Sequence, residues 1–218
     1  MLSRIDRAVR FGIRRLDGNS GITLVELLVA MMLMLVVLGA IYTVWFGLQR
    51  SYSFTNDDMS AQEEARAAMN EMVELIRTAR QPDPAPSEDL ALVIVSADAN
   101  QLVCWTDTDR DANHDLELVR FRVDESTRTL YRDDSHAGDP AFGDSSTVRM
   151  VGKWLSNDAA DPLFTYISGN GSTLATPVVD PTQIRQVVID LKIDIYTDEA
   201  PIAHELRSVV QPRNLRQY

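Results

Sequence analysis

The sequence has few of the residues on which covalent links and catalysis depend. Its 218 residues include one cysteine, so no internal disulfide can form. This residue, Cys104, lies in the apolar run 102–105 and is expected to be a buried thiol rather than a nucleophile. The three histidines, His114, His136 and His204, are scattered, and the sequence shows no nucleophile motif, metal-ligand spacing or glycine-rich phosphate loop. We therefore expect a protein that is not an enzyme.

Positive charge is also scarce, and it is unevenly placed. The chain has 21 Lys and Arg against 32 Asp and Glu, a net charge of -11. Its first 21 residues contain five arginines and two aspartates, or +3, so the remainder carries -14. So acidic a surface repels phosphate backbones, which argues against nucleic-acid binding. A local basic patch is conceivable at four arginines, but their alternation predicts the solvent-exposed face of strands instead: Arg120, Arg122, Arg128 and Arg132.

One long apolar run stands out against this background. Residues 22–48 contain a single charged side chain, Glu26, and the run exceeds the roughly 20 residues that a helix needs to cross a bilayer core. The arginine-rich segment precedes it, so the positive-inside rule places that segment in the cytoplasm and the rest of the chain on the other side. Tyr42, Trp45 and Phe46 near the far end are typical of an interfacial aromatic belt.

The small residues lie on the unexpected side of this run. A secretory signal peptide is cleaved after its apolar segment, at small residues. Here the small residues come before it, at 18–21, and no Ala-x-Ala site follows Leu48. A plain membrane anchor therefore leaves two features unexplained, namely Gly21 at the entry of the helix and the carboxylate of Glu26 five residues later.

Residues 21–30, with the sequence GITLVELLVA, resemble the cleavage and methylation motif of type IV prepilins and pseudopilins. In that family a membrane aspartyl peptidase cuts after the glycine on the cytoplasmic side and N-methylates the new first residue. The resemblance implies cleavage between Gly21 and Ile22, with Glu26 as the glutamate of the fifth mature position. The chain departs from the family at Ile22, where phenylalanine is usual.

The position of Glu26 has two interpretations. A carboxylate inside an apolar helix costs roughly 2.5–3.5 kcal/mol on insertion scales, so it usually has a partner. The resemblance implies that Glu26 pairs with the Ile22 amine of a neighbouring subunit and fixes the axial register during assembly. Alternatively, Glu26 reaches the lipid headgroups and complements the helix dipole. The glycine and the leader favour the assembly role.

Helical periodicity resumes after a polar patch at residues 51–58. Apolar residues recur at spacings of three and four, which predicts an amphipathic helix with one buried stripe: Ala65, Met69, Met72, Ile76 and Ala79. We expect a bend or short break between residues 47 and 58, and the prolines after residue 81 end the helix. The predicted organisation is a leader at 1–21, a transmembrane helix at 22–48, its amphipathic continuation at 49–81, a proline-rich linker at 82–89 and a globular head at 90–218.

The head is predicted to form an antiparallel β-sheet, because short runs of alternating apolar and polar residues are separated by turn signals. The strands are expected at 90–95, 101–106, 117–123, 128–132, 187–195 and 203–210, with a tight turn at 169–171 and an irregular region at 133–162. The predicted fold class is therefore α+β, a long N-terminal helix packed on an antiparallel sheet. Its order of elements is similar to that of the larger minor pilins, PilW-type minor pilins and J-type minor pseudopilins of type II secretion.

An acidic segment in the head has the alternation of a calcium loop. The candidate ligands are Asp107, Asp109, Asp111, Asn113 and Asp115. Calcium takes six to eight oxygen ligands, but Ala112 stands where an EF-hand loop needs glycine, and Arg110 places a positive charge among the ligands. A solvated hairpin loop without any cofactor is the favoured interpretation, and a calcium site is the alternative.

The leading hypothesis is a minor pilin or pseudopilin that primes or caps a type IV pilus or a type II secretion pseudopilus. The resemblance implies as partners prepilin peptidase, other pilins or pseudopilins, the inner-membrane assembly platform and membrane lipid. It also implies an inner-membrane protein with a periplasmic head, which later enters the fibre. The alternative is an unprocessed, single-pass anchored binding module or adhesin. The sequence does not separate pilus, secretion and competence systems.

Overall fold

The structure is a computed structural model of the chain and describes residues 21–83, 85–108, 115–135, 142, 147–195 and 204–213. The chain separates into two compact units, residues 1–51 and residues 52–218. Helix α1 (Leu24–Thr78) contributes to both, and the remaining elements belong to the second unit.

Helix α1 has 55 residues and runs without interruption, so the break expected between residues 47 and 58 is wrong. Proline is absent from this stretch until Pro82, and leucine, methionine and alanine, which favour helices, dominate its first half. In the first unit every described residue, from Gly21 to Ser51, is exposed. This part of the helix therefore has no core of its own to cover its apolar surface.

In the second unit the same helix buries one face. Its buried side chains recur at helical spacing, and they include the predicted stripe: Ala61, Ala65, Ala68, Met69, Met72, Leu75 and Ile76, followed by Ala79 just beyond the helix. The prediction of an amphipathic second half is confirmed. After Thr78 the chain turns away from the helix, and the Arg80 N–H donates to the main-chain oxygen of Trp105 at 3.0 Å.

The strands form two antiparallel sheets rather than one. The first has the order β1-β2-β3-β4-β5, with β1 (Ile94–Ala97), β2 (Gln101–Thr106), β3 (Glu117–Asp124), β4 (Thr129–Asp134) and β5 (Thr147–Gly152). The second has the order β7-β6-β8-β9, with β6 (Phe164–Ser168), β7 (Thr173–Leu174), β8 (Ile184–Ile193) and β9 (His204–Val210). Short 3-10 helices occur at Glu88–Leu90 and Pro181–Gln183. The α+β fold class is confirmed.

Most predicted strands are present, and the errors in the strand prediction are explained by the local sequence. The strand expected at 101–106 is β2, while the one expected at 90–95 begins only at Ile94 because a 3-10 helix occupies 88–90. Residues 133–162 were expected to be irregular, yet β5 lies among them. Strand β6 also was not predicted, although Phe164 and Tyr166 alternate as buried residues. In both strands two adjacent apolar residues interrupt the alternation, Met150 and Val151 in β5 and Tyr166 and Ile167 in β6.

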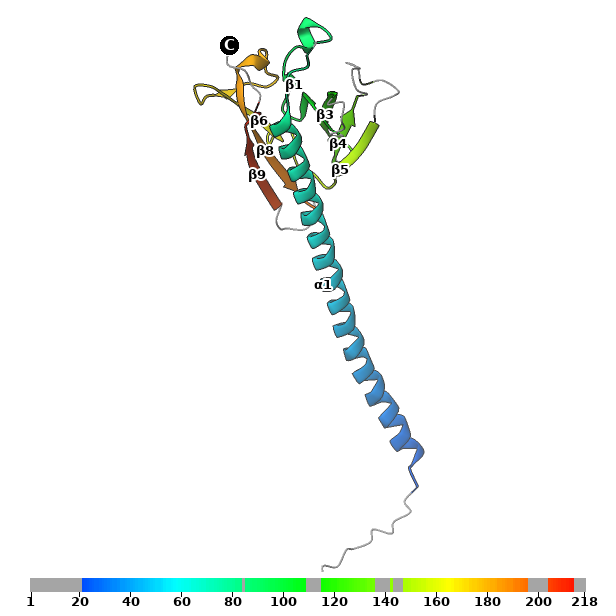
Figure 1. The fold of residues 1–218 in the computed structure, drawn as a ribbon. Helices are drawn as coiled ribbons and strands as arrows, with labels where there is room; N and C mark the ends of the chain where they lie inside the picture. Colours follow the sequence, from blue (N-terminus) through cyan, green and yellow to red (C-terminus); the bar gives the residue numbers. More distant parts are fainter. Residues whose placement is uncertain are drawn as a thin grey trace, which may run out of the picture. The chain divides into compact units, whose positions relative to one another are not determined.

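The buried face of α1 is covered by side chains from both sheets. The core contains Leu102, Val119 and Phe121 from the first sheet and Tyr166, Val187, Ile189 and Leu191 from the second, together with the buried helix residues. Figure 1 shows β8 and β9 on one side of the helix and β3, β4 and β5 on the other. Trp105, Val103 and Leu118 form a smaller apolar cluster outside this core.

One arginine joins the two sheets. Arg128 ends the β3–β4 turn with a positive φ of 53°, an uncommon conformation for a residue other than glycine. Its guanidinium donates to the main-chain oxygens of Leu155 (2.9 Å), Trp154 (3.3 Å) and Asp194. The strained backbone is thus held by hydrogen bonds to a segment that also pairs with β8 through Leu155 and Ile193.

Candidate processing and assembly site

The N-terminal end of α1 is defined by one hydrogen-bonded turn. Gly21, Ile22 and Thr23 are not helical, and the helix begins at Leu24. The Glu26 N–H donates to Thr23 Oγ1 at 3.2 Å, and the Leu27 N–H donates to the Thr23 main-chain oxygen at 3.1 Å. Thr23 is therefore the N-cap, and Glu26 lies in the first turn, where a carboxylate complements the helix dipole.

Neither sterics nor backbone conformation in the described structure requires glycine at position 21. Among the described residues, no atom lies within 4 Å of a Cβ added to Gly21, and its φ lies outside the left-handed region. Ile22 next to it is 74% exposed. The Gly21–Ile22 peptide bond thus lies in exposed, non-helical backbone immediately before the capped helix.

The helix that follows is long and apolar enough to cross a membrane. Its large apolar side chains are exposed from Leu24 to Leu48, so Glu26 is surrounded along the chain by residues that suit a lipid environment. Tyr42 and Phe46 stack with ring centroids 6.1 Å apart near the far end of this stretch. The interfacial aromatic belt itself stays a prediction.

The arginines of the head are not simply solvated, contrary to prediction. Arg132 of β4 is almost fully buried and reaches α1, where its Nη1 is 2.6 Å from Glu71 Oε1, while its Nε donates to Asp134 Oδ1 at 2.6 Å. The exposed Arg149 also reaches Glu71 Oε1 at 2.6 Å. Burial lowers the pKa of Arg132, but hydrogen bonds to Asp134 and Glu71 outweigh it and raise that pKa overall. Arg132 is a structural cation between helix and sheet.

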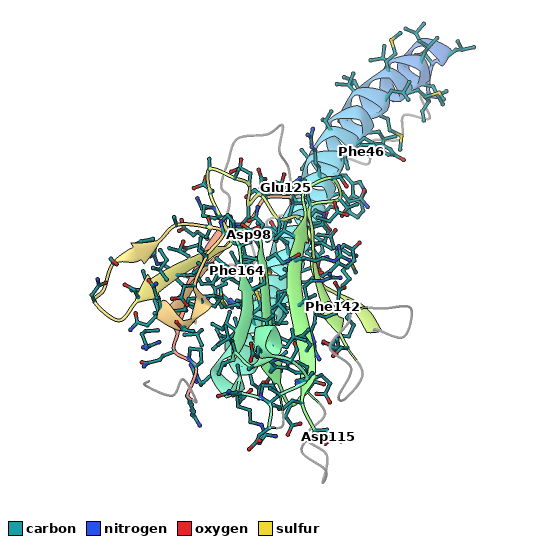
Figure 2. The ribbon with its side chains drawn as sticks, turned by 90° about the horizontal axis from the view of Figure 1, so that it is seen from above. Phe46, Asp98, Asp115, Glu125, Phe142 and Phe164 are labelled. Atoms are coloured by element: carbon teal, nitrogen blue, oxygen red, sulfur yellow. The ribbon has the colours of Figure 1, made fainter. Side chains whose placement is uncertain are left out.

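Two further arginines surround a buried carboxylate. The Asp133 side chain is inaccessible to solvent, and its Oδ2 accepts hydrogen bonds from Arg120 Nε (2.7 Å) and Arg122 Nε (2.9 Å). The guanidinium of Arg120 also lies 4.3 Å from the ring centroid of Phe142, which Figure 2 labels, and that of Arg122 lies over Tyr131. These arginines compensate a buried charge rather than forming a basic patch, because a buried carboxylate requires partners.

The one described histidine also has a structural contact. His204 Nε2 lies 2.7 Å from Asp58 Oδ1, which links the start of β9 to α1. Gln62 donates to the other oxygen of Asp58 at 3.1 Å. His114 and His136 lie outside the described residues.

Cys104 is buried, as predicted. Burial raises the pKa of its thiol to about 12, against a smaller opposing effect of Arg132. A thiol with so high a pKa is protonated at neutral pH and therefore unreactive. The same burial raises the pKa of Tyr166, whose hydroxyl donates to the Asp98 main-chain oxygen at 2.8 Å.

The predicted calcium loop lies largely outside the described residues. Asp109, Asp111 and Asn113 are not described, and Asp107 and Asp115 are the two candidate ligands that are. Asp107 lies 3.9 Å from the Arg80 guanidinium, and Asp115 is exposed next to the start of β3 (Figure 2). No group of three or more acidic, histidine or cysteine side chains suited to a metal occurs among the residues described. The calcium site stays a prediction.

Comparison with known proteins addresses the N-terminal segment. Residues 17–42 match the family model of the prokaryotic N-terminal methylation motif. This match supports a type IV prepilin-like protein. The match covers the leader boundary, the cap and the apolar part of α1, and it ends before the head of this prepilin-like chain. A search of curated proteins finds no match.

The motif includes Gly21, the start of α1 and the apolar part of the helix in one N-terminal segment. It implies processing by prepilin peptidase and assembly with other pilins, and with the apolar helix it fits a membrane-anchored subunit. The cap at Thr23 was not recognised from the sequence. The spacing Thr-x-x-Glu, which is typical of a capping box, was the available signal.

Proposed function

We propose that the chain is a minor pilin or pseudopilin subunit. In this proposal prepilin peptidase cuts between Gly21 and Ile22 and methylates the new N-terminus. The mature subunit then assembles through α1 into a type IV pilus or a type II secretion pseudopilus, which it primes or caps. The observation that carries the proposal is the position of Glu26. It is the one acidic side chain in the exposed apolar part of α1, residues 24–51, and it lies in the first turn, five residues after Gly21.

The geometry around Gly21 supports the cleavage step. Because nothing among the described residues approaches an added Cβ at this position, the fold does not account for the glycine, whereas a partner that approaches the backbone closely would. A peptidase that must reach the Gly21–Ile22 bond is such a partner. The bond lies outside the helix, where extended backbone can enter a proteolytic site more readily than hydrogen-bonded helix.

The position of Glu26 supports the assembly step. Cleavage would leave a free amine on Ile22, a short distance along the chain from Thr23 and Glu26. A carboxylate and an amine on neighbouring subunits attract each other strongly in the low dielectric of a membrane. Pairing between subunits would remove the cost of the isolated acid and set the axial spacing of the helices.

The partners in this proposal are prepilin peptidase, other pilins or pseudopilins, the inner-membrane assembly platform and membrane lipid. Before assembly the chain is a single-pass inner-membrane protein with its head in the periplasm. Type IV pilin-like proteins are structural, which supports a subunit that is not an enzyme. The proposal includes no cofactor.

Mass spectrometry of the N-terminus of the membrane protein tests the proposal. We expect a mature chain that begins with methylated Ile22 in cells that contain prepilin peptidase. A Gly21→Leu variant should keep its leader, because the side chain obstructs close approach of the peptidase. A wild-type chain that still begins at Met1 in those cells would instead identify an unprocessed anchored binding module or adhesin.

A further inference from the structure

The turn between β6 and β7 contains the one asparagine of the chain that is followed by glycine. Asn170 and Gly171 are both exposed. The Gly171 N–H donates to the Ser168 main-chain oxygen at 3.0 Å, which closes a β-turn over residues 168–171. Gly171 has a φ of 84°, a left-handed conformation that glycine adopts without steric cost. The turn therefore places an exposed carboxamide directly before a residue without a side chain.

The Asn170 carboxamide oxygen faces two donors. Oδ1 accepts a hydrogen bond from the Ser172 N–H at 2.9 Å and another from the Ser168 hydroxyl, whose proton is shared with the Ser172 main-chain oxygen at 3.0 Å. A main-chain N–H can only donate, so the atom that faces it is the oxygen of the carboxamide and not its nitrogen. This bond also folds the carboxamide back over the Gly171 peptide, which lies between the two bonded residues.

Two other asparagines of the head are held at both ends of the carboxamide. Asn157 is 5% exposed, its nitrogen donates to two main-chain oxygens at 2.7 and 3.1 Å, and its oxygen accepts from the Lys192 N–H at 3.0 Å. Asn100 likewise uses its nitrogen and its oxygen in hydrogen bonds. Within the described part of the chain, the Asn170 nitrogen has no hydrogen-bond acceptor. The three side chains thus differ in how easily the carboxamide nitrogen can leave.

We propose that Asn170 is a site of spontaneous deamidation. The Gly171 nitrogen loses its proton to hydroxide and attacks Asn170 Cγ, the bond from Cγ to Nδ2 breaks, and the nitrogen leaves as ammonia. The product is a five-membered succinimide ring, which water opens at either carbonyl to give aspartate or isoaspartate at position 170. Water is the only co-reactant, and nothing is oxidised or reduced.

The geometry of the turn favours this reaction. Negative charge develops on Oδ1 as the Gly171 nitrogen adds to Cγ, and the donors from Ser172 and Ser168 already face that atom. No described atom lies within 4 Å of a Cβ added to Gly171, so the turn has room to rearrange. The bond from the Gly171 N–H to the Ser168 oxygen must open first, and hydrogen bonds of exposed turns open readily.

Both products change the hairpin. Aspartate keeps an oxygen for the Ser172 N–H but adds a negative charge to a chain whose net charge is already -11. Isoaspartate inserts an extra methylene into the main chain, so the bond from the Ser168 N–H to the Ser172 oxygen loses its spacing. Strand β7 has only two residues, so this edge of the second sheet should loosen. The change accumulates with the age of each copy and does not depend on the proposed function.

Mass spectrometry of the ageing full-length chain tests the site. The detergent-solubilised protein is kept for days in mildly alkaline buffer made with heavy-oxygen water, and samples are digested at intervals. We expect Asn170 to become a mixture of aspartate and isoaspartate that contains one heavy oxygen, while Asn100 and Asn157 stay intact in the same digests. Conversion of Asn170 no faster than that of Asn157 would overturn the proposal. Aspartate without isoaspartate would also overturn it, because direct attack by water gives only aspartate.

Substitutions in the turn test the nucleophile and the donors. Gly171→Ala should convert more slowly, because the methyl group obstructs attack by the nitrogen, and an unchanged rate would show that this nitrogen is not the nucleophile. Ser168→Ala removes one donor and should slow the conversion roughly two- to tenfold, whereas Ser168→Thr keeps the hydroxyl and should convert at nearly the wild-type rate. Equal rates for Ser168→Ala and Ser168→Thr would refute the assigned role of the hydroxyl.

Discussion

The two parts of α1 share one helix but differ in what can cover them. From Leu24 to Ser51 every side chain is exposed, and apolar residues occur all round the helix. From Tyr52 to Thr78 apolar residues are confined largely to one face, where Met72 and Ile76 are completely buried. The second part is covered by its own head, whereas the first requires lipid or other helices. The comparison shows that helix length alone says little about function, and that the distribution of apolar side chains around the helix is decisive.

Removing the acid from the first part should have the largest effect. We expect Glu26→Leu to insert into the membrane normally but to lose assembly, because the pairing with a neighbouring amine is gone. Glu26→Gln should behave similarly, and Glu26→Asp should retain part of the function if charge is the property that matters. Fibre formation or secretion is measured beside the amount of membrane-inserted protein. Normal assembly of Glu26→Leu would contradict the proposed role.

A matched pair of core truncations sharpens the comparison between the two parts. Met72→Ala should destabilise the second unit by roughly 2–5 kcal/mol, because it leaves a cavity between the helix and both sheets. Leu35→Ala should leave the stability of that unit unchanged, since Leu35 has no contact with its core. Chemical unfolding of the detergent-solubilised full chain, followed by tryptophan fluorescence, measures both. Equal destabilisation by the two substitutions would refute this division of the helix.

Substituting the buried Arg132 should have a smaller effect, and the exposed Arg149 provides a matched control. Arg132→Met should cost roughly 3 kcal/mol, because it leaves Glu71 and Asp134 without their buried cation. Arg149→Met should cost roughly 1 kcal/mol or less, since the Arg149 side chain is 55% exposed whereas that of Arg132 is 8% exposed. The same unfolding measurement applies to both. Similar costs for the two variants would show that burial does not distinguish these ion pairs.

The helix cap should give the smallest effect. Thr23→Val removes the oxygen that accepts the Glu26 N–H and should weaken the first turn by about 1 kcal/mol, whereas Thr23→Ser should preserve it. Hydrogen exchange at the Glu26 and Leu27 amides measures the change. If both amides exchange at the wild-type rate in Thr23→Val, the cap does not stabilise this end of the helix.

Several parts of the fold were predictable because a local sequence pattern indicates each of them. The stripe from Ala65 to Ile76 has helical spacing, and β8 alternates Ile189, Leu191 and Ile193 with charged residues, so both were recognised. The division into two sheets was not predictable in this way, because periodicity defines a strand but not its neighbours. The roles of Arg132 and Asp133 were missed for a related reason. Alternation in β4 suggests exposure, while their burial depends on α1 and on the arginines of β3.

The sequence by itself determined the prepilin-like N-terminus, because Gly21, the apolar run and Glu26 are adjacent in the chain and need no folding to be recognised. It also determined the amphipathic second half of α1. Only the tertiary structure decided which charges are structural and which remain on the surface. Glu71 is paired to Arg132 across 61 positions of sequence, whereas Glu63 on the same helix faces outward. The physical reason is that the contribution of a charge to stability depends on its neighbours and its burial. The chain acquires both only when distant segments pack together.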